Sequence, residues 1–125
     1  MSTPAPFGRM LTAMVTPFTK DGAIDWNGVE VIADHLVHHG HDGIVVNGTT
    51  GEAPTTKSSE KEEIIKVVKK VVGANIKVIS GAGDNETDYS INQAKRSEAA
   101  GADGILVVTP YYNKPPQAGI EAHFL

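Results

Sequence analysis

Short apolar runs rich in Val and Ile alternate along the chain with longer segments of helical periodicity. The runs span residues 10–15, 43–47, 76–80 and 105–108, and each is followed within two residues by Gly or Pro. Short runs that are apolar on both faces are typical of strands buried in a parallel sheet. The pattern therefore predicts strands at these positions.

The segment after the first run has the spacing of an amphipathic helix. Asp25 precedes it and is suited to act as the N-cap, and Gly40 follows where a helix commonly ends. The apolar positions recur every three or four residues, which places them on one helical face. They are Val29, Ile32, Ala33, Leu36 and Val37.

Three more helices are expected in the intervals that remain. Ser59 and Glu62 have the spacing of a capping box, and the helix that they begin ends before Gly73. Its buried face is predicted to consist of Ile64, Ile65, Val67, Val68, Val71 and Val72. A further helix is expected at about residues 86–100, and residues 117–125 predict the start of another.

The resulting order, β-α-β-α-β-α-β-(α), predicts an α/β fold with a parallel sheet and right-handed crossovers. Residues 40–44 (GHDGI) return 61 residues later as residues 101–105 (GADGI), which is a spacing of two βα units. This repeat favours the N-terminal half of a (β/α)8 TIM barrel, because a full barrel takes roughly 250 residues. We expect one partial barrel domain over residues 1–125, ending within the fourth helix. An open doubly wound sheet is the competing architecture, although a G-x-G-x-x-G loop does not follow the first strand.

Composition and charge exclude several classes of protein. The chain has 125 residues, 40% of them hydrophobic and 21% charged, with a net charge of −4 and no Cys. The negative charge argues against nucleic acid or an anionic membrane as partner, and the absence of Cys excludes disulfides and thiolate chemistry. Residues 1–8 are expected to form a loose arm. The sequence shows neither a signal peptide nor a membrane-spanning run, so a cytoplasmic location is expected.

The turn after the second run carries the most suggestive chemistry. Thr49 and Thr50 stand between Gly48 and Gly51, and these glycines allow backbone N–H groups and both hydroxyls to approach a ligand. Such a loop can hold a carboxylate or a phosphate. Taken alone, so short a motif favours a threonine turn without a ligand.

Other hydroxyls are expected at the same edge of the sheet. Thr16 follows the first run and Tyr112 follows the fourth, and the carboxyl ends of parallel strands share one edge. Neutral hydroxyls can pass protons along a hydrogen-bonded chain, since each can donate in one direction and accept in the other. These residues predict a proton relay beside an anion site.

Further candidates have structural explanations. His35 and His39 share a helix face, but without a third ligand they predict a solvated helix end rather than a metal site, and no metal or cofactor is expected. Residues 81–83 (GAG) could cradle a phosphate, or they could keep the mouth of a barrel open.

Three motifs together resemble the dihydrodipicolinate synthase family, a group of pyruvate-dependent class I aldolases built on (β/α)8 barrels. They are Thr16-Pro17, residues 48–52 (GTTGE) and residues 109–115 (TPYYNKP), in the family's order and spacing. The resemblance extends over essentially the whole chain. It implies a lyase that condenses pyruvate with aspartate semialdehyde through a lysine Schiff base, in diaminopimelate and lysine biosynthesis.

The resemblance also implies roles for individual residues. Thr50 would bind the pyruvate carboxylate, Thr49 would be the middle member of a tyrosine–threonine–tyrosine relay, and Tyr112 would reach into a neighbouring subunit. The family is usually a dimer of dimers, so a homotetramer is expected. The Schiff-base lysine and the second relay tyrosine would lie beyond Leu125, and residues 1–125 alone are therefore expected to be inactive.

Lysine feedback is a second implication of the resemblance. Asn85 and Tyr111 match the lining of the family's allosteric lysine site. Ser58, Lys61 and Tyr89 stand where regulated members often place histidines and a glutamate, so weak or absent lysine inhibition is expected. The alternatives are a related aldolase, such as an N-acetylneuraminate lyase or a keto-deoxy sugar-acid aldolase, and a half-barrel without catalysis that binds anions or pairs with another half.

Overall fold

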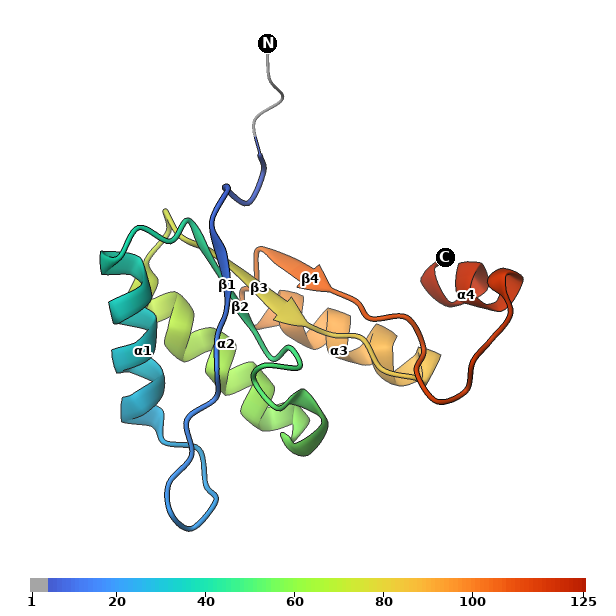
Figure 1. Ribbon diagram of the computed structural model, residues 1–125, viewed down its shortest axis with the longest axis horizontal. Helices are drawn as coiled ribbons and strands as arrows, with labels where there is room; N and C mark the ends of the chain where they lie inside the picture. The colour runs from blue at the N-terminus through green and yellow to red at the C-terminus, as the bar shows by residue number, and fades with distance from the viewer. Residues whose placement is uncertain (1–4) are drawn as a thin grey trace.

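The computed structural model describes residues 5–125, and these form four parallel strands interleaved with helices (Figure 1). The strands are β1 (Leu11–Ala13), β2 (Gly43–Val46), β3 (Lys77–Gly81) and β4 (Gly104–Leu106), and they lie in the sheet in sequence order. The predicted parallel sheet is confirmed. Each strand is shorter than, or shifted from, its apolar run, because only the residues that pair with a neighbour count as strand.

The helices are α1 (Trp26–His38), α2 (Ser58–Val72), α3 (Thr87–Ala99) and α4 (Gln117–Phe124), with a short 3-10 turn, η1 (Ala53–Thr55), before α2. The predicted N-cap of α1 is confirmed, since the Asp25 carboxylate accepts a hydrogen bond from the Gly28 N–H at 3.0 Å. Within the described residues, no helix is long and apolar enough to cross a membrane.

The capping box predicted for α2 was placed wrongly. The helix begins at Ser58, and the Glu60 carboxylate accepts the backbone N–H of Lys57 at 2.7 Å. Glu62, which was expected to cap the helix, instead pairs with Arg96 of α3. Lys57 has an extended backbone and is the N-cap, so Glu60 is the third residue of the helix and closes the capping box. Glu62 lies two residues further along the helix, where it reaches Arg96 of α3.

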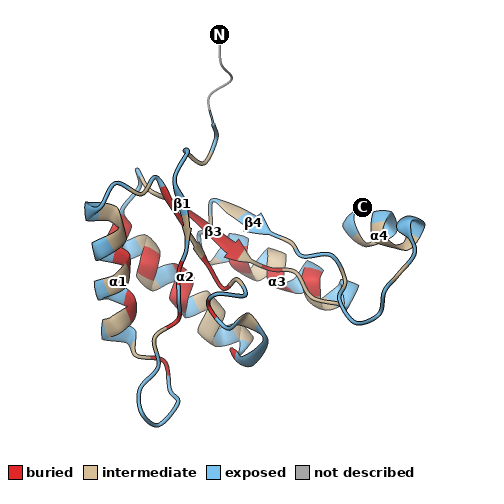
Figure 2. Cartoon of the chain, in the orientation of Figure 1, coloured by how far each residue is buried: buried red, intermediate tan, exposed pale blue. Residues whose placement is uncertain are grey.

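The core lies between the sheet and helices that cover one of its faces. Ile44, Val46 and Val78 project from that face and pack with Val29 of α1 and Val68 of α2. Figure 2 shows these buried positions along β2, β3 and the adjoining sides of the helices. The predicted apolar faces of α1 and α2 are thereby confirmed.

The third helix covers the same face of the sheet, which decides between the two architectures. Ser80 is in register with Val46, and its hydroxyl accepts a hydrogen bond from Ser97 of α3 at 3.2 Å. A doubly wound sheet carries helices on both faces, whereas a barrel carries them on the outer face alone. The arrangement is that of a half-barrel, whose edge strands leave Leu11 and Leu106 exposed.

The repeated sequence has a structural role at the amino-terminal edge of the sheet. Asp42 accepts the backbone N–H groups of Arg9 and Met10, at 2.8 and 2.9 Å, just before β1. Asp103 accepts the N–H of Val78 in β3 at 2.8 Å. Each aspartate precedes its own strand and fixes the start of the neighbouring one, which explains why the motif recurs after two βα units.

The loose arm predicted for residues 1–8 falls partly outside the described residues, because residues 1–4 are not among them. Phe7 is half-buried rather than loose. A Cβ atom built on Gly104 would come within 2.9 Å of its ring, so this glycine leaves room for the aromatic side chain beside β4.

Candidate functional site

The loop after β2 is a compact series of turns. The N–H groups of Gly51 and Ala53 both bond to the carbonyl of Gly48, at 3.0 and 3.2 Å, and the Glu52 N–H bonds to the carbonyl of Thr49 at 3.0 Å. Asn47 and Glu52, at the two ends of the loop, have positive φ values of 57° and 56°. Asn tolerates this region better than most residues, so the chain can turn sharply at the end of the strand.

Thr49 and Thr50 have hydrogen-bonding groups that the fold does not use. Both residues are exposed. Within residues 5–125, no hydrogen bond involves the hydroxyl or the N–H of either threonine. Two adjacent residues with free donors at the end of a buried strand can bind a carboxylate without losing any internal contact.

Thr16 has a different role from the one predicted. It is buried, and its hydroxyl donates to the carbonyl of Gly51 at 2.7 Å. A Cβ atom on Gly51 would lie 3.1 Å from this hydroxyl, so the glycine and the threonine fit closely together. Thr16 is therefore an internal anchor of the threonine loop and presents no free hydroxyl at the rim.

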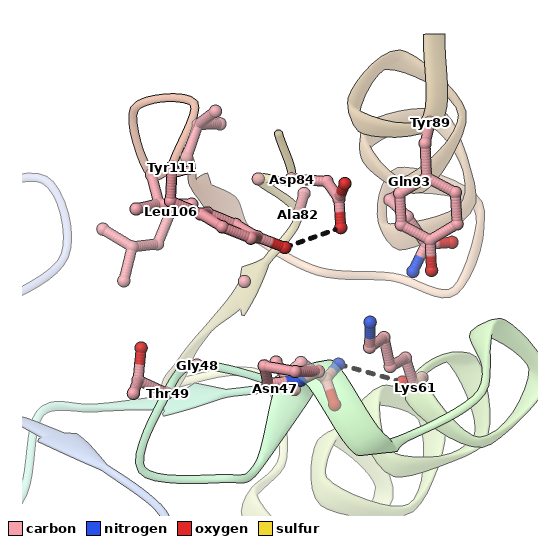
Figure 3. A pocket seen from close by; sticks show the side chains of 16 residues that line it. Asn47, Gly48, Thr49, Lys61, Ala82, Asp84, Tyr89, Gln93, Leu106 and Tyr111 are labelled. Carbon is pink, nitrogen blue, oxygen red and sulfur yellow. Dashed lines mark hydrogen bonds between the residues drawn. The ribbon is translucent and has the colours of Figure 1, made fainter. Parts of the chain in front are cut away.

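A pocket of about 410 Å³ opens at the carboxyl-terminal edge of the sheet (Figure 3). Thr49 lines it from the end of β2, residues 81–84 from the end of β3, and Leu106 from β4. Lys61 of α2 and Tyr89 of α3 contribute from the helices. Of the predicted site residues, Thr49 lies in this pocket with the ends of β3 and β4, whereas Thr50 and Tyr112 are not among the lining residues.

The two adjacent tyrosines after β4 point in different directions. The Tyr111 ring lines the pocket, and its hydroxyl donates to the Asp84 carboxylate at 3.1 Å (Figure 3). Burial and the Asp84 carboxylate raise the pKa of Tyr111 above its usual value, so this hydroxyl remains a donor at neutral pH. Tyr112 has a positive φ of 65° and is 92% exposed. The described chain brings Tyr111, and not Tyr112, into the pocket with Thr49.

One end of the pocket carries a positive charge held beside an aromatic ring. The Lys61 ammonium lies 5.8 Å from the centroid of the Tyr89 ring, a cation–π distance. The Tyr89 hydroxyl lies 3.2 Å from the Ser58 hydroxyl. These three residues, which were singled out in the sequence for the lysine site, do lie together in the fold.

The glycines of residues 81–83 allow neighbouring strand ends to approach closely. A Cβ atom on Gly81 would lie 2.0 Å from the Asn47 carbonyl oxygen, and one on Gly83 would lie 2.3 Å from the Val108 nitrogen. Backbone from both neighbouring strands therefore occupies the space where side chains would be. The glycines are therefore explained by close strand packing, which differs from both expectations, a phosphate cradle and an open barrel mouth.

The histidines of α1 lie at its exposed end. The rings of His35 and His39 stack with their centroids 3.9 Å apart, and His39 Nδ1 donates to the His35 carbonyl at 2.6 Å. Across residues 5–125, His, Asp and Glu side chains nowhere gather in a group of three that could hold a metal ion.

Sequence reasoning missed Asn47 as a component of the site. It is 2% exposed, lines the pocket, and hydrogen-bonds to both α2 and β3. The available signal was its position between a β-branched strand and Gly48, where an Asn commonly marks a left-handed backbone. Asp84 was also missed, since its partnership with Tyr111 joins positions 27 residues apart.

Comparison with known proteins places these features in a family. The model of the dihydrodipicolinate synthetase family matches residues 6–125. A 4-hydroxy-tetrahydrodipicolinate synthase from Acidothermus cellulolyticus is 59% identical over 121 residues, which cover 97% of this chain and 39% of that protein. The chain thus spans about two fifths of the length of the curated relatives that it matches.

Solved structures give the same result. The lysine-bound enzyme of Cyanidioschyzon merolae is 50% identical, with a TM-score of 0.93 over 97% of this chain and 41% of that one. The chloride-inhibited enzyme of Acinetobacter baumannii, in complex with pyruvate, is 41% identical, with a TM-score of 0.90 over 92% of this chain and 40% of that one.

Proposed function

Because the chain belongs to the dihydrodipicolinate synthetase family, we propose that it is part of a lyase that condenses pyruvate with aspartate semialdehyde. The relative from Acidothermus cellulolyticus carries the name of this synthase, and the structure from Acinetobacter baumannii contains pyruvate. The product would enter the synthesis of diaminopimelate and lysine. As in the family, pyruvate would form a Schiff base with a lysine supplied by a part of the protein beyond Leu125.

The observation that carries this proposal is the pair of free donors at Thr49 and Thr50. A pyruvate carboxylate needs N–H and O–H donors that are fixed in place and not already engaged. The Thr50 hydroxyl and N–H would supply them, at the end of a strand in which three of the four residues are buried. A loop held by its own backbone bonds keeps these donors in place before the substrate arrives.

Thr49 and Tyr112 would move protons between the substrates and solvent. Thr49 lines the pocket and has an unengaged hydroxyl, so it can accept a proton on one side and donate one on the other. Tyr112 projects into solvent, and we infer that it completes the site of a neighbouring copy of the chain. Its exposure suits a residue that functions only when a second subunit packs against it. We therefore propose that the protein assembles as a dimer of dimers, the usual assembly of the family. We also propose that it acts in the cytoplasm.

Borohydride trapping tests the chemistry. The full-length protein is incubated with pyruvate and sodium borohydride, and its mass is measured. We expect a covalent pyruvate adduct on one lysine. Replacing Thr50 by Val should raise the pyruvate concentration that gives half-maximal trapping about tenfold, because the hydrogen bond from the hydroxyl to a charged group is lost while the backbone N–H remains. Thr19→Val is the matched control, since Thr19 is an exposed threonine of the β1–α1 loop and does not line the pocket.

The same experiment separates the alternatives. Absence of an adduct at saturating pyruvate in the full-length protein would favour a half-barrel without catalysis. An adduct that reacts with other aldehydes but not with aspartate semialdehyde would identify a related aldolase. Residues 1–125 alone should form no adduct. Lys61, which lines the pocket, is the lysine to examine if they do.

A further inference from the structure

Asn47 connects the threonine loop to the two elements beneath it. Its side-chain amide donates to the carbonyl of Lys61 in α2 and to the hydroxyl of Ser80 in β3, both at 3.1 Å. The dashed line in Figure 3 marks the first of these bonds. One side chain thus joins the end of β2 to a helix and to the neighbouring strand.

The backbone of Asn47 is held as firmly as its side chain. Its carbonyl lies against Gly81, where a Cβ atom would come within 2.0 Å of the oxygen. Its positive φ sets the direction in which the chain leaves the strand. At the other end of the loop, the Thr16 hydroxyl holds the carbonyl of Gly51. The four residues from Gly48 to Gly51 are therefore fixed at both ends, while within residues 5–125 the N–H and hydroxyl groups of Thr49 and Thr50 stay free.

Burying the Asn47 side chain costs folding free energy, so its presence is not explained by stability alone. The Asn47 side chain is almost completely buried, and its Oδ1 atom has no hydrogen-bond partner within residues 5–125. A buried polar atom without a partner is unfavourable, and an apolar side chain would avoid it. A side chain retained at such a cost, directly before the substrate loop, is a candidate for a functional role.

We propose that Asn47 is a positioning residue for the pyruvate carboxylate. It acts through Thr50, by fixing the backbone from which the Thr50 N–H and hydroxyl project. This inference rests on the proposed function for the identity of the ligand, but the clamp itself can be measured without substrate. Without the amide, the loop would keep its turns and lose its fixed position relative to α2 and β3.

The test compares Asn47→Gly with Ser97→Ala in the full-length protein. Gly tolerates the positive φ, so the first variant removes the amide bridge without adding backbone strain. Ser97 donates to the same Ser80 hydroxyl from the α3 side and does not touch the loop. The control therefore also removes one hydrogen bond to the Ser80 hydroxyl, but from the side away from the loop. Thermal unfolding of both variants shows whether they fold.

Amide hydrogen exchange provides the readout that needs no substrate. In Asn47→Gly we expect the N–H groups of Gly51, Glu52 and Ala53 to exchange about tenfold faster, because two hydrogen bonds that fix the loop are lost. Amides in the centre of α1 should be unchanged. In Ser97→Ala the loop amides should keep the wild-type rate. Unchanged loop exchange in Asn47→Gly overturns the inference.

Steady-state kinetics then connects the clamp to the ligand. KM for pyruvate should rise about tenfold in Asn47→Gly and stay within twofold in Ser97→Ala, while KM for the aldehyde stays within twofold in both. Faster exchange with an unchanged KM for pyruvate would overturn the positioning role. If the wild-type protein neither traps nor turns over pyruvate, the proposed function fails, whereas the exchange data still decide whether Asn47 holds the loop.

Discussion

At the amino-terminal edge of the sheet, Asp42 and Asp103 direct their carboxylates inward to backbone N–H groups of a neighbouring strand or of the segment just before it. At the carboxyl-terminal edge, Thr49 and Thr50 have hydroxyls and N–H groups that no other residue of the described range 5–125 engages. Both edges belong to the same strands, so the strands themselves cannot account for the difference. The aspartates of one edge fix the sheet, whereas the two threonines of the other edge leave their donors free at the edge where barrel enzymes usually bind their substrates.

Electrostatics sharpens the contrast. Hydrogen bonds from the backbone of Met10 and Arg9 lower the pKa of Asp42. Burial acts to raise the pKa of Asp103, but hydrogen bonds from the Lys69 ammonium and the Val78 N–H outweigh it and lower the pKa. At the other edge, the pKa of Tyr111 is raised. At neutral pH the Asp42 and Asp103 carboxyls are therefore charged acceptors, whereas the Tyr111 hydroxyl is a neutral donor.

The largest effect is expected at Thr49. Thr49→Val should lower kcat about 100-fold, the scale of a lost general acid–base contribution, and should leave the free energy of unfolding unchanged within 0.5 kcal/mol or so. The hydroxyl has no partner within the described chain, so the fold loses nothing. Steady-state kinetics and urea unfolding of the full-length protein measure the two quantities. A loss of stability that matched the loss of rate would show that this edge also serves the fold.

A glycine pair tests how closely the carboxyl-terminal edge is packed. Gly81→Ala should lower the free energy of unfolding by about 2 kcal/mol, because the new methyl group meets the Asn47 carbonyl. Gly48→Ala is the matched control, since a Cβ atom there has no neighbour within 4 Å. Thermal and urea unfolding compare the two. Equal stability of the two variants would contradict the close contact between Gly81 and Asn47.

The amino-terminal edge should respond in stability and not in activity. Asp103→Asn should lower the free energy of unfolding by about 1–2 kcal/mol, because bonds to a charged acceptor weaken, while kcat stays within twofold. Since the folded-state pKa of Asp103 is lowered, its contribution is present above the usual carboxyl pKa and is lost as pH falls through the lowered value. Urea unfolding at pH 7 and at acidic pH measures this. The gap between wild type and variant should close in acid, and a constant gap would exclude the carboxylate as its source.

The smallest effect is expected from lysine. The Lys61 ammonium beside Tyr89 places a positive charge at the pocket, so a cationic amino acid should bind weakly there. Titration of the full-length protein with lysine should leave most activity at 1 mM or thereabouts, although the relative from Cyanidioschyzon merolae was crystallised with lysine bound. Lys61→Glu should increase sensitivity, with Lys66→Glu on the same helix as the control. Strong inhibition of the wild type at sub-millimolar lysine would refute the expectation.

Periodicity was sufficient for the elements and for much of the core. Helix α1 has the predicted cap at Asp25, and its buried residues Val29 and Ala33 are among those that the spacing selected. The capping box of α2 was misplaced because Glu60 and Glu62 both lie near the helix start, and local sequence does not reveal that Arg96 engages the second.

The loop with free donors could be located from the sequence because its residues are contiguous. Thr49 and Thr50 stand together in one motif, and the loop does present both with free donors. Thr16 was misassigned because its partner, the carbonyl of Gly51, is 35 residues away and belongs to the backbone. A bond to a backbone carbonyl so far along the chain cannot be predicted from the pattern of side chains.

The sequence by itself determined the order of strands and helices, the repeat and the threonine loop, because periodicity and turn chemistry act over a few residues. Only the tertiary structure decided which hydroxyls remain free. Thr16 and Thr49 are the same residue type at two strand ends, yet one is buried against Gly51 and the other is exposed in a pocket. Whether a polar group is consumed by the fold or left for a ligand depends on what lies opposite it. The packing of neighbouring strands against each other determines which residue lies opposite each polar group.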